Sequence, residues 1–135
     1  KFYYKNILSK NINDKNIIVK DFIERMDLAY NVSDIIISRA GAIAISELCV
    51  VSKPLILVPS PNVVDDHQTK NANAISEKGG CILIKDSEAK DIMVKTAFEL
   101  FESQNKMENM KNSLSKLASP NARKKIVKKI YEIIS

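Results

Sequence analysis

The chain has 135 residues and a formal net charge of +5, from 21 Lys and Arg against 16 Asp and Glu. Hydrophobic residues make up 45% and charged residues 27%, which is typical of one globular domain with a modest core. No apolar run approaches the roughly 18 residues of a membrane span.

One histidine and two cysteines without metal-ligand spacing predict no metal site, and we expect no cofactor. Cys49 and Cys81 lie in apolar patterns, so we expect buried, reduced thiols of a cytosolic protein.

Four short apolar runs predict strands that alternate with helices. They lie at residues 17–19, 35–37, 55–58 and 81–84. Helical spacing separates them, beginning with a short helix at residues 24–30. This alternation predicts an α/β fold, with a Rossmann-like parallel sheet of about four strands and helices on both faces.

Helices are expected at the two ends of the chain. Residues 1–10 are spaced like the end of a helix. A helix capped by Asp86 or Ser87 is expected after the fourth strand, and residues 107–117 have helical spacing. Pro120 begins a last helix with one apolar face. A helical C-terminal tail therefore follows the sheet.

The tail is strongly basic. Residues 103–135 hold eight Lys and Arg against two acidic residues, a net charge of +6. We favour a solvated helix face as the explanation. An anionic lipid surface is the alternative, at ~1 kcal/mol for each basic residue near it. Nucleic acid is not expected as a partner, because no aromatic residues interleave the basic cluster as a stacking surface requires.

A turn of small residues follows the second strand. Residues 35–37 lead into Ala40 and Gly41, and the apolar spacing then becomes helical. The small side chains at Ala40, Gly41 and Ala42 let a ligand approach the first free N–H groups of the helix closely. Because the helix dipole favours negative charge there, the turn is a candidate site for an anion such as a diphosphate.

Glu47 lies in the otherwise apolar helix that follows this turn. It is about six residues from the helix start, or roughly 9 Å at ~1.5 Å per residue, where a ribose would lie beyond a bound diphosphate. A carboxylate accepts hydrogen bonds from two neighbouring hydroxyls. An exposed helix glutamate, or a buried one paired with Arg39, is an equally open interpretation.

A second polar cluster is expected where the helix after the third strand begins. Asp65 and Gln68 fit a capping box with Asp65 as N-cap, which explains both residues structurally. The functional alternative is that His67, Gln68 and Asn71 face the same crevice as Glu47, because both helix starts follow the carboxyl ends of parallel strands.

Together these segments resemble the donor-site signature of the MurG family of UDP-N-acetylglucosamine transferases, which convert lipid I to lipid II in peptidoglycan synthesis. The combination is more specific than any of its parts, which are Ser38-Arg39-Ala40-Gly41-Ala42, Ser46-Glu47-Leu48, Lys53-Pro54, Val58-Pro59, Asp66-His67-Gln68 and Asn71-Ala72. The resemblance covers essentially the whole chain but only the last part of the family's sequence. It therefore implies that residues 1–135 are a partial C-terminal nucleotide-sugar-binding domain of a GT-B glycosyltransferase, without the N-terminal acceptor domain.

The resemblance also implies residue roles. The glutamate matching Glu47 holds the ribose, the residues matching Gln68 and His67 reach the sugar, and the backbone after Gly41 holds the diphosphate. Residues 22–26 resemble the stretch that borders the uracil. The substrate-binding residues implied are Ile23, Met26, Arg39, Gly41, Ala42, Ile43, Ala44, Glu47, His67, Gln68 and Asn71. Many relatives carry a threonine at Ala44, so a hydroxyl contact to phosphate is lost there. No catalytic residue is expected in this chain, because the family's base is thought to lie in the acceptor domain.

The implied partners are UDP-N-acetylglucosamine and a lipid-linked acceptor held by the missing domain. The whole protein would be cytoplasmic and peripheral on the inner face of the cell membrane. Alternatives are a separate donor subunit of a split UDP-N-acetylglucosamine transferase, a related enzyme such as a 2-epimerase, and a non-enzymatic sugar-nucleotide binding module.

The family's missing segments include two strands and a Gly-Gly-Ser loop that faces the diphosphate. Without those strands we expect an unpaired sheet edge at residues 34–37. Either the chain self-associates through this edge, or residues 16–20 pair with it directly. Donor affinity is expected to be weak without the loop.

Overall fold

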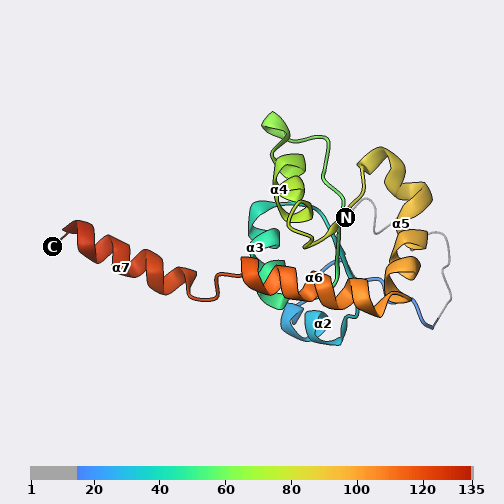
Figure 1. Ribbon diagram of the computed structural model, residues 1–135, viewed down its shortest axis with the longest axis horizontal. Helices are drawn as coiled ribbons and strands as arrows, with labels where there is room; N and C mark the ends of the chain where they lie inside the picture. Colours follow the sequence, from blue (N-terminus) through green and yellow to red (C-terminus); the bar gives the residue numbers. More distant parts are fainter. Residues whose placement is uncertain (1–14, 135) are drawn as a thin grey trace. The chain divides into compact units, whose positions relative to one another are not determined.

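The computed structural model describes residues 15–134, apart from the side chain of Val64, as an α/β protein with a parallel sheet flanked by helices (Figure 1). The expected helix end at residues 1–10 lies outside the described residues. The elements in chain order are α2 (Met26–Val32), β1 (Ile36–Ser38), α3 (Ala42–Val51), β2 (Leu55–Leu57), η1 (Val64–Asp66), α4 (His67–Ser76), β3 (Ile82–Leu83), α5 (Asp86–Phe101), α6 (Gln104–Leu117) and α7 (Ala122–Ile134).

The chain divides into two compact units, Lys1–Val32 and Ser33–Ser135. In the part of the first unit that the structure describes, the helix is α2, and none of its residues is buried. Residues 17–19 form no strand, so the expected first strand is wrong, as is its direct pairing with residues 34–37. A β-branched run becomes a strand only where a neighbour supplies ladder hydrogen bonds, and within residues 15–134 no strand pairs with this run.

The sheet of the second unit has three parallel strands in the order β1-β2-β3, where about four were expected. The ladder extends past the strand ends, since the Val58 N–H donates to Ser38 O and the Ile84 N–H to Leu57 O, both at 2.9 Å. The central strand β2 is buried along its length, as expected of a strand with neighbours on both sides. Because all three strands run the same way, their carboxyl ends share one edge of the sheet.

The core joins the sheet to helices α3 and α6, which pack against each other. Leu48 of α3 and Leu114 of α6 are almost fully buried between them. Met110 of α6 reaches the sheet, where its Sδ lies 3.0 Å from the backbone N of Leu55. Because Leu55 begins β2, this contact joins α6 to the amino end of the central strand.

Both cysteines are buried and unpaired, as predicted. Burial raises the pKa of Cys81 to about 12, with a smaller contribution from Cys49, and burial also raises the pKa of Cys49. The thiols are therefore protonated at neutral pH and contribute to packing.

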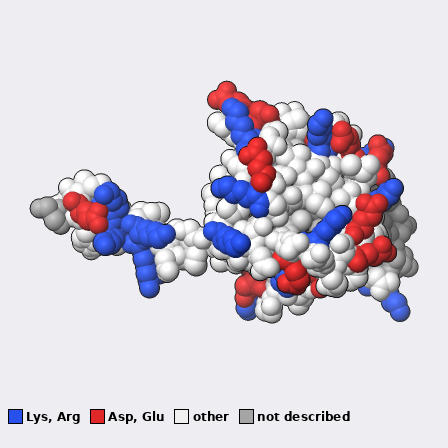
Figure 2. Space-filling model, in the orientation of Figure 1, with Lys and Arg blue, Asp and Glu red and all other residues white. Residues whose placement is uncertain are grey.

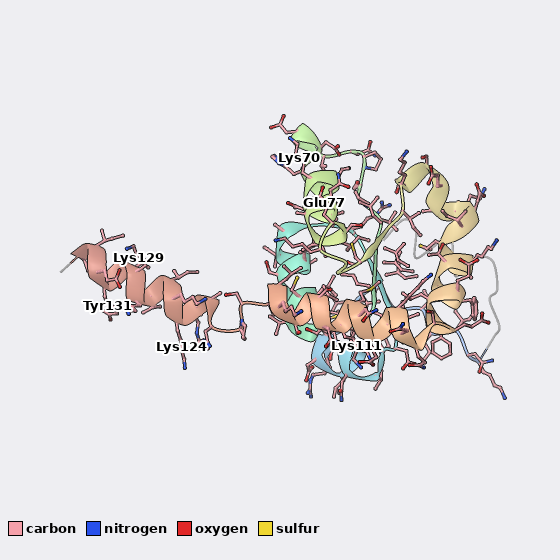
Figure 3. All side chains as sticks on the ribbon, in the orientation of Figure 1. Lys70, Glu77, Lys111, Lys124, Lys129 and Tyr131 are labelled. Carbon is pink, nitrogen blue, oxygen red and sulfur yellow. The ribbon has the colours of Figure 1, made fainter. Side chains whose placement is uncertain are left out.

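The helix α7 confirms the predicted basic, amphipathic tail. Figure 2 shows Lys and Arg side chains gathered on α7, and Figure 3 labels Lys124, Lys129 and Tyr131 on it. None of the residues of α7 is buried. Among residues 15–134, no helix has both the length and the apolar character needed to cross a bilayer.

Candidate functional site

The loops that follow the three strands meet where the carboxyl ends of the strands lie. Hydrogen bonds to α4 join the loop after β1 to the loop after β2. The side chain of Gln68, in the first turn of α4, is central. Its Oε1 accepts hydrogen bonds from the backbone N–H of Ala40, at 3.2 Å, and of Ser60, at 2.9 Å. Two N–H donors fix this atom as the amide oxygen. The Nε2 group of Gln68, which carries two donors, has no hydrogen-bond partner among residues 15–134.

Asn71 lies one turn further along α4 and holds the same loop. Its Nδ2 donates to Ala40 O at 3.3 Å. Both backbone groups of Ala40, which is fully buried, are thus bound by side chains of α4. The structure brings Asn71 to the predicted crevice, where its observed contact is to the protein backbone.

The capping-box interpretation of Asp65 and Gln68 is wrong. The N-cap of α4 is Asp66, and no side chain caps the helix. Asp65 and Asp66 both have left-handed backbone conformations, with φ of 53° and 52°, which delays the helix start to His67. Aspartate is among the few residue types that adopt this conformation readily.

The start of α3 is open. Gly41 is its N-cap and no side chain caps it. Apart from residues 40–42, no heavy atom of the described chain lies within 4 Å of where a Cβ of residue 41 would stand. The first helical hydrogen bond of α3 runs from the Ile45 N–H to Gly41 O, at 2.9 Å. The N–H groups of Ala42, Ile43 and Ala44 consequently have no intrahelical partner. Free donors and a helix dipole are the features on which the expected anion site depends, and binding of an anion there stays a prediction.

Glu47 on α3 and His67 at the start of α4 are exposed side chains. Glu47 makes no hydrogen bond or ion pair within residues 15–134, so a buried pair with Arg39 is wrong. The Nε2 of His67 lies 3.8 Å from an Asp65 carboxylate oxygen. Glu47 and His67 are therefore both accessible to a ligand.

Arg39 binds protein groups. Its Nη1 donates to the carbonyl oxygens of Val58 and Pro59, both at 3.2 Å, and the guanidinium pairs with Asp86. The predicted cap at Asp86 or Ser87 is also wrong, because Lys85 is the N-cap of α5 and Asp86 is the first helical residue. Sequence reasoning missed the role of Asp86, since no local pattern marks a partner 47 positions away.

A hollow of about 300 Å³ lies beside the Arg39 pair in the second unit. It is lined by Ile37, Ser38, Arg39, Val58, Asp86, Ala89, Lys90 and Met93. Both charged partners of the pair thus face this hollow.

Ile23 and Met26 belong to the first unit. Ile23 is 41% exposed and Met26 39% exposed, and Ile23 lines a hollow of about 720 Å³ within residues 18–32. Their place beside a uracil stays a prediction.

Comparison with known proteins gives a consistent result. Residues 3–130 match the model of the glycosyltransferase family 28 C-terminal domain. The UDP-N-acetylglucosamine--N-acetylmuramyl-(pentapeptide) pyrophosphoryl-undecaprenol N-acetylglucosamine transferase of Cytophaga hutchinsonii is 47% identical over 135 residues, which are 100% of this chain and 36% of that protein. The protein of the same name from Porphyromonas gingivalis is 47% identical over 116 residues, covering 86% of this chain and 31% of its own length.

A solved structure agrees. The crystal structure of Acinetobacter baumannii MurG superposes with a TM-score of 0.82 at 28% identity, covering 96% of this chain and 38% of that chain. The chain thus spans about a third of the length of the relatives that it matches. The predicted fold, a C-terminal part of a MurG-like glycosyltransferase, is confirmed.

Proposed function

Because the chain belongs to the glycosyltransferase family 28 C-terminal domain family, we propose that it is the donor-binding part of a UDP-N-acetylglucosamine transferase. The relatives' name gives the acceptor as an N-acetylmuramyl-(pentapeptide) pyrophosphoryl-undecaprenol. The proposed reaction is the transfer of N-acetylglucosamine to this acceptor, which converts lipid I to lipid II.

The open N-terminus of α3 next to the Gln68 bridge is the observation that carries this proposal. It combines N–H groups without intrahelical partners at residues 42–44 with the amide donors of Gln68 on one edge of the sheet. The N–H groups suit a diphosphate, which carries negative charge on acceptor oxygens. The Gln68 Nε2 donors suit the hydroxyl oxygens of a sugar attached to it.

Glu47 is proposed to hold the ribose. Glu47 is exposed and lies six residues after the N-cap Gly41, a rise of about 9 Å along α3 at ~1.5 Å per residue. This spacing matches a nucleoside diphosphate whose phosphates occupy the helix start. His67 is proposed to contact the sugar, and Ile23 and Met26 to border the uracil.

In the proposed chemistry, the acceptor hydroxyl attacks the anomeric carbon, the bond from that carbon to the UDP oxygen breaks, and the hydroxyl proton passes to a base. The departing UDP gains negative charge, which the α3 N–H groups stabilise. We assign the base to the acceptor-binding part of the protein. His67 is not assigned this role, because its family counterpart contacts the sugar.

The acceptor's lipid chain implies where the whole protein works. We propose peripheral contact with the cytoplasmic face of the membrane, where the undecaprenol group is anchored. We also propose that the chain alone self-associates through β1, which pairs with β2 on one side only in the described sheet.

Isothermal titration of this chain with UDP-N-acetylglucosamine, UDP-N-acetylgalactosamine and UDP tests the proposed function. We expect binding of all three, with preference for the first. Glu47→Gln should weaken UDP by about 1.5 to 3 kcal/mol, because hydrogen bonds to a charged acceptor have this strength. Glu77→Gln is the matched control, since Glu77 is exposed and lies at the C-terminal end of α4, away from Gln68 in its first turn (Figure 3). No binding of any nucleotide, or equal UDP affinity of Glu47→Gln and the parent, would contradict the proposal.

A further inference from the structure

The guanidinium of Arg39 lies where three loops of the sheet edge meet. Arg39 directly follows β1, its two carbonyl partners Val58 and Pro59 directly follow β2, and Asp86 begins α5 just after β3. By contrast, the ion pair of Lys111 with Glu108 joins residues three positions apart within α6. The Arg39 contacts therefore connect segments that are distant in the sequence.

The loops that Arg39 joins are the ones that position Gln68. Arg39 is followed by Ala40, and Pro59 by Ser60, and the N–H groups of Ala40 and Ser60 are the two donors to Gln68 Oε1. The two loops are thus joined in two ways at neighbouring positions. Arg39 of the first loop donates to the second loop directly, and Gln68 accepts one N–H from each loop. A shift of either loop would move one of the two donors and turn the Gln68 amide.

We propose that Arg39 is a positioning residue of the donor site, which fixes the spacing between Ala40 and Ser60 and thereby aims the Gln68 amide. This inference rests on the function proposed above. It replaces the expectation that Arg39 binds the substrate directly.

The charge and one nitrogen of Arg39 are already engaged by the protein. Nη1 contacts three oxygens of the protein, and the Asp86 carboxylate offsets the positive charge. A planar guanidinium suits this arrangement, because its donors have a fixed geometry that the compact ammonium of lysine lacks. An Arg39→Lys variant is therefore expected to keep only part of the connection between the loops.

The test measures two independent quantities in the parent, Arg39→Met, Asp86→Asn and the double variant. The first is hydrogen exchange of the Ala40 and Ser60 amides without ligand, and the second is the calorimetric Kd for UDP-N-acetylglucosamine. We expect Arg39→Met to raise both exchange rates and the Kd by on the order of tenfold, as for removal of a coupled contact. Asp86→Asn should change both in the same direction by a smaller factor, and the double variant should not exceed Arg39→Met.

The sign of the Asp86→Asn effect separates positioning from direct contact. If Arg39 contacted the diphosphate, loss of the neutralising carboxylate would leave affinity unchanged or increase it, and either result would overturn the proposal. Unchanged exchange at Ala40 and Ser60 in Arg39→Met would overturn it as well. Lys111→Met and Glu108→Gln on α6 are the matched controls and should change neither quantity. Figure 3 labels Lys111.

The two measurements also separate this inference from the proposed function. If the parent binds no nucleotide sugar while the exchange rates rise as expected, the donor-binding function fails and the tie through Arg39 is supported. If the parent binds and Arg39→Met matches it in both quantities, the function is supported and the positioning role fails.

Discussion

Gln68 and Ala40 lie 28 positions apart in the sequence and are joined by a hydrogen bond of 3.2 Å from the Ala40 N–H to Gln68 Oε1. The same oxygen accepts from Ser60. One side chain therefore has two separable functions, since Oε1 binds the protein and the Nε2 donors remain for the ligand.

Gln68→Ala and Gln68→Glu should separate these functions. Gln68→Ala leaves the buried Ala40 N–H without its acceptor and is expected to lower the free energy of unfolding by about 1 to 3 kcal/mol. Gln68→Glu keeps an acceptor oxygen and removes the amide donors, so it should unfold near the parent's temperature and lose the preference for UDP-N-acetylglucosamine over UDP. Thermal melts and calorimetry check both, with Gln104→Ala as control. A Gln68→Glu variant that retains the preference would refute the donor role of Nε2.

Gly41 and Gly80 should respond oppositely to substitution by alanine. Gly41 has φ of −67° and an unoccupied position for a Cβ, so Gly41→Ala should change the free energy of unfolding by less than about 1 kcal/mol. Its methyl group would crowd an anion at the start of α3, and UDP affinity should fall. A Cβ at Gly80 would stand 2.9 Å from Ile75 Cγ2, so Gly80→Ala should cost about 1 to 3 kcal/mol and spare affinity in the folded protein. Parent-like UDP binding by Gly41→Ala would argue against a phosphate there.

The buried thiol of Cys81 predicts a loss of stability at alkaline pH. Its folded-state pKa is raised from about 9 to about 12, so the unfolded chain releases this proton at a lower pH than the folded chain does. The stabilisation is fully present below pH 9 and is lost as pH rises from about 9 towards 12. Urea unfolding between pH 7.5 and 10.5 should show this decline, which Cys81→Ala should reduce. An identical decline in Cys81→Ala would exclude Cys81 as the cause.

The edge strand β1 predicts self-association of the isolated chain. In the described sheet β1 pairs only with β2, so its other side is expected to offer backbone groups to another chain, and Ile37 on this strand is 42% exposed. Light scattering should give a mass that rises with concentration, and Ile37→Lys should keep the chain monomeric. Val50→Lys, at an exposed apolar position on α3, is the control. A monodisperse parent monomer at all concentrations would contradict this prediction.

Local patterns predicted the elements well because their causes are local. The change of apolar spacing at Gly41 located the start of α3, and three of the four apolar runs became strands within about a residue of the expected positions. The run at residues 17–19 failed because a strand also requires a neighbour. A helix start was expected near Asp65 or Asp66, and α4 begins at His67 with Asp66 as its N-cap. The capping role of Asp65 was wrong because two left-handed residues, which no spacing rule indicates, precede His67.

The connections within the site were not predictable from the sequence in the same way. Arg39 and Asp86 are 47 positions apart, and their pairing depends on parallel strands bringing their carboxyl ends to one edge. The sequence singled out candidate residues for the site, and the fold determines which of them bind the protein. Arg39 and Asn71 make their observed contacts to the chain itself, while Glu47 and His67 are exposed.

The central claim is that the start of α3 binds the diphosphate of a UDP-sugar. Its most direct test is a titration of the isotope-labelled chain with UDP, followed by the backbone amide resonances. We predict saturable shifts that are largest at residues 40–44 and small on α6. Saturable binding with shifts elsewhere and none at residues 40–44, or no shifts at millimolar UDP, would contradict the claim.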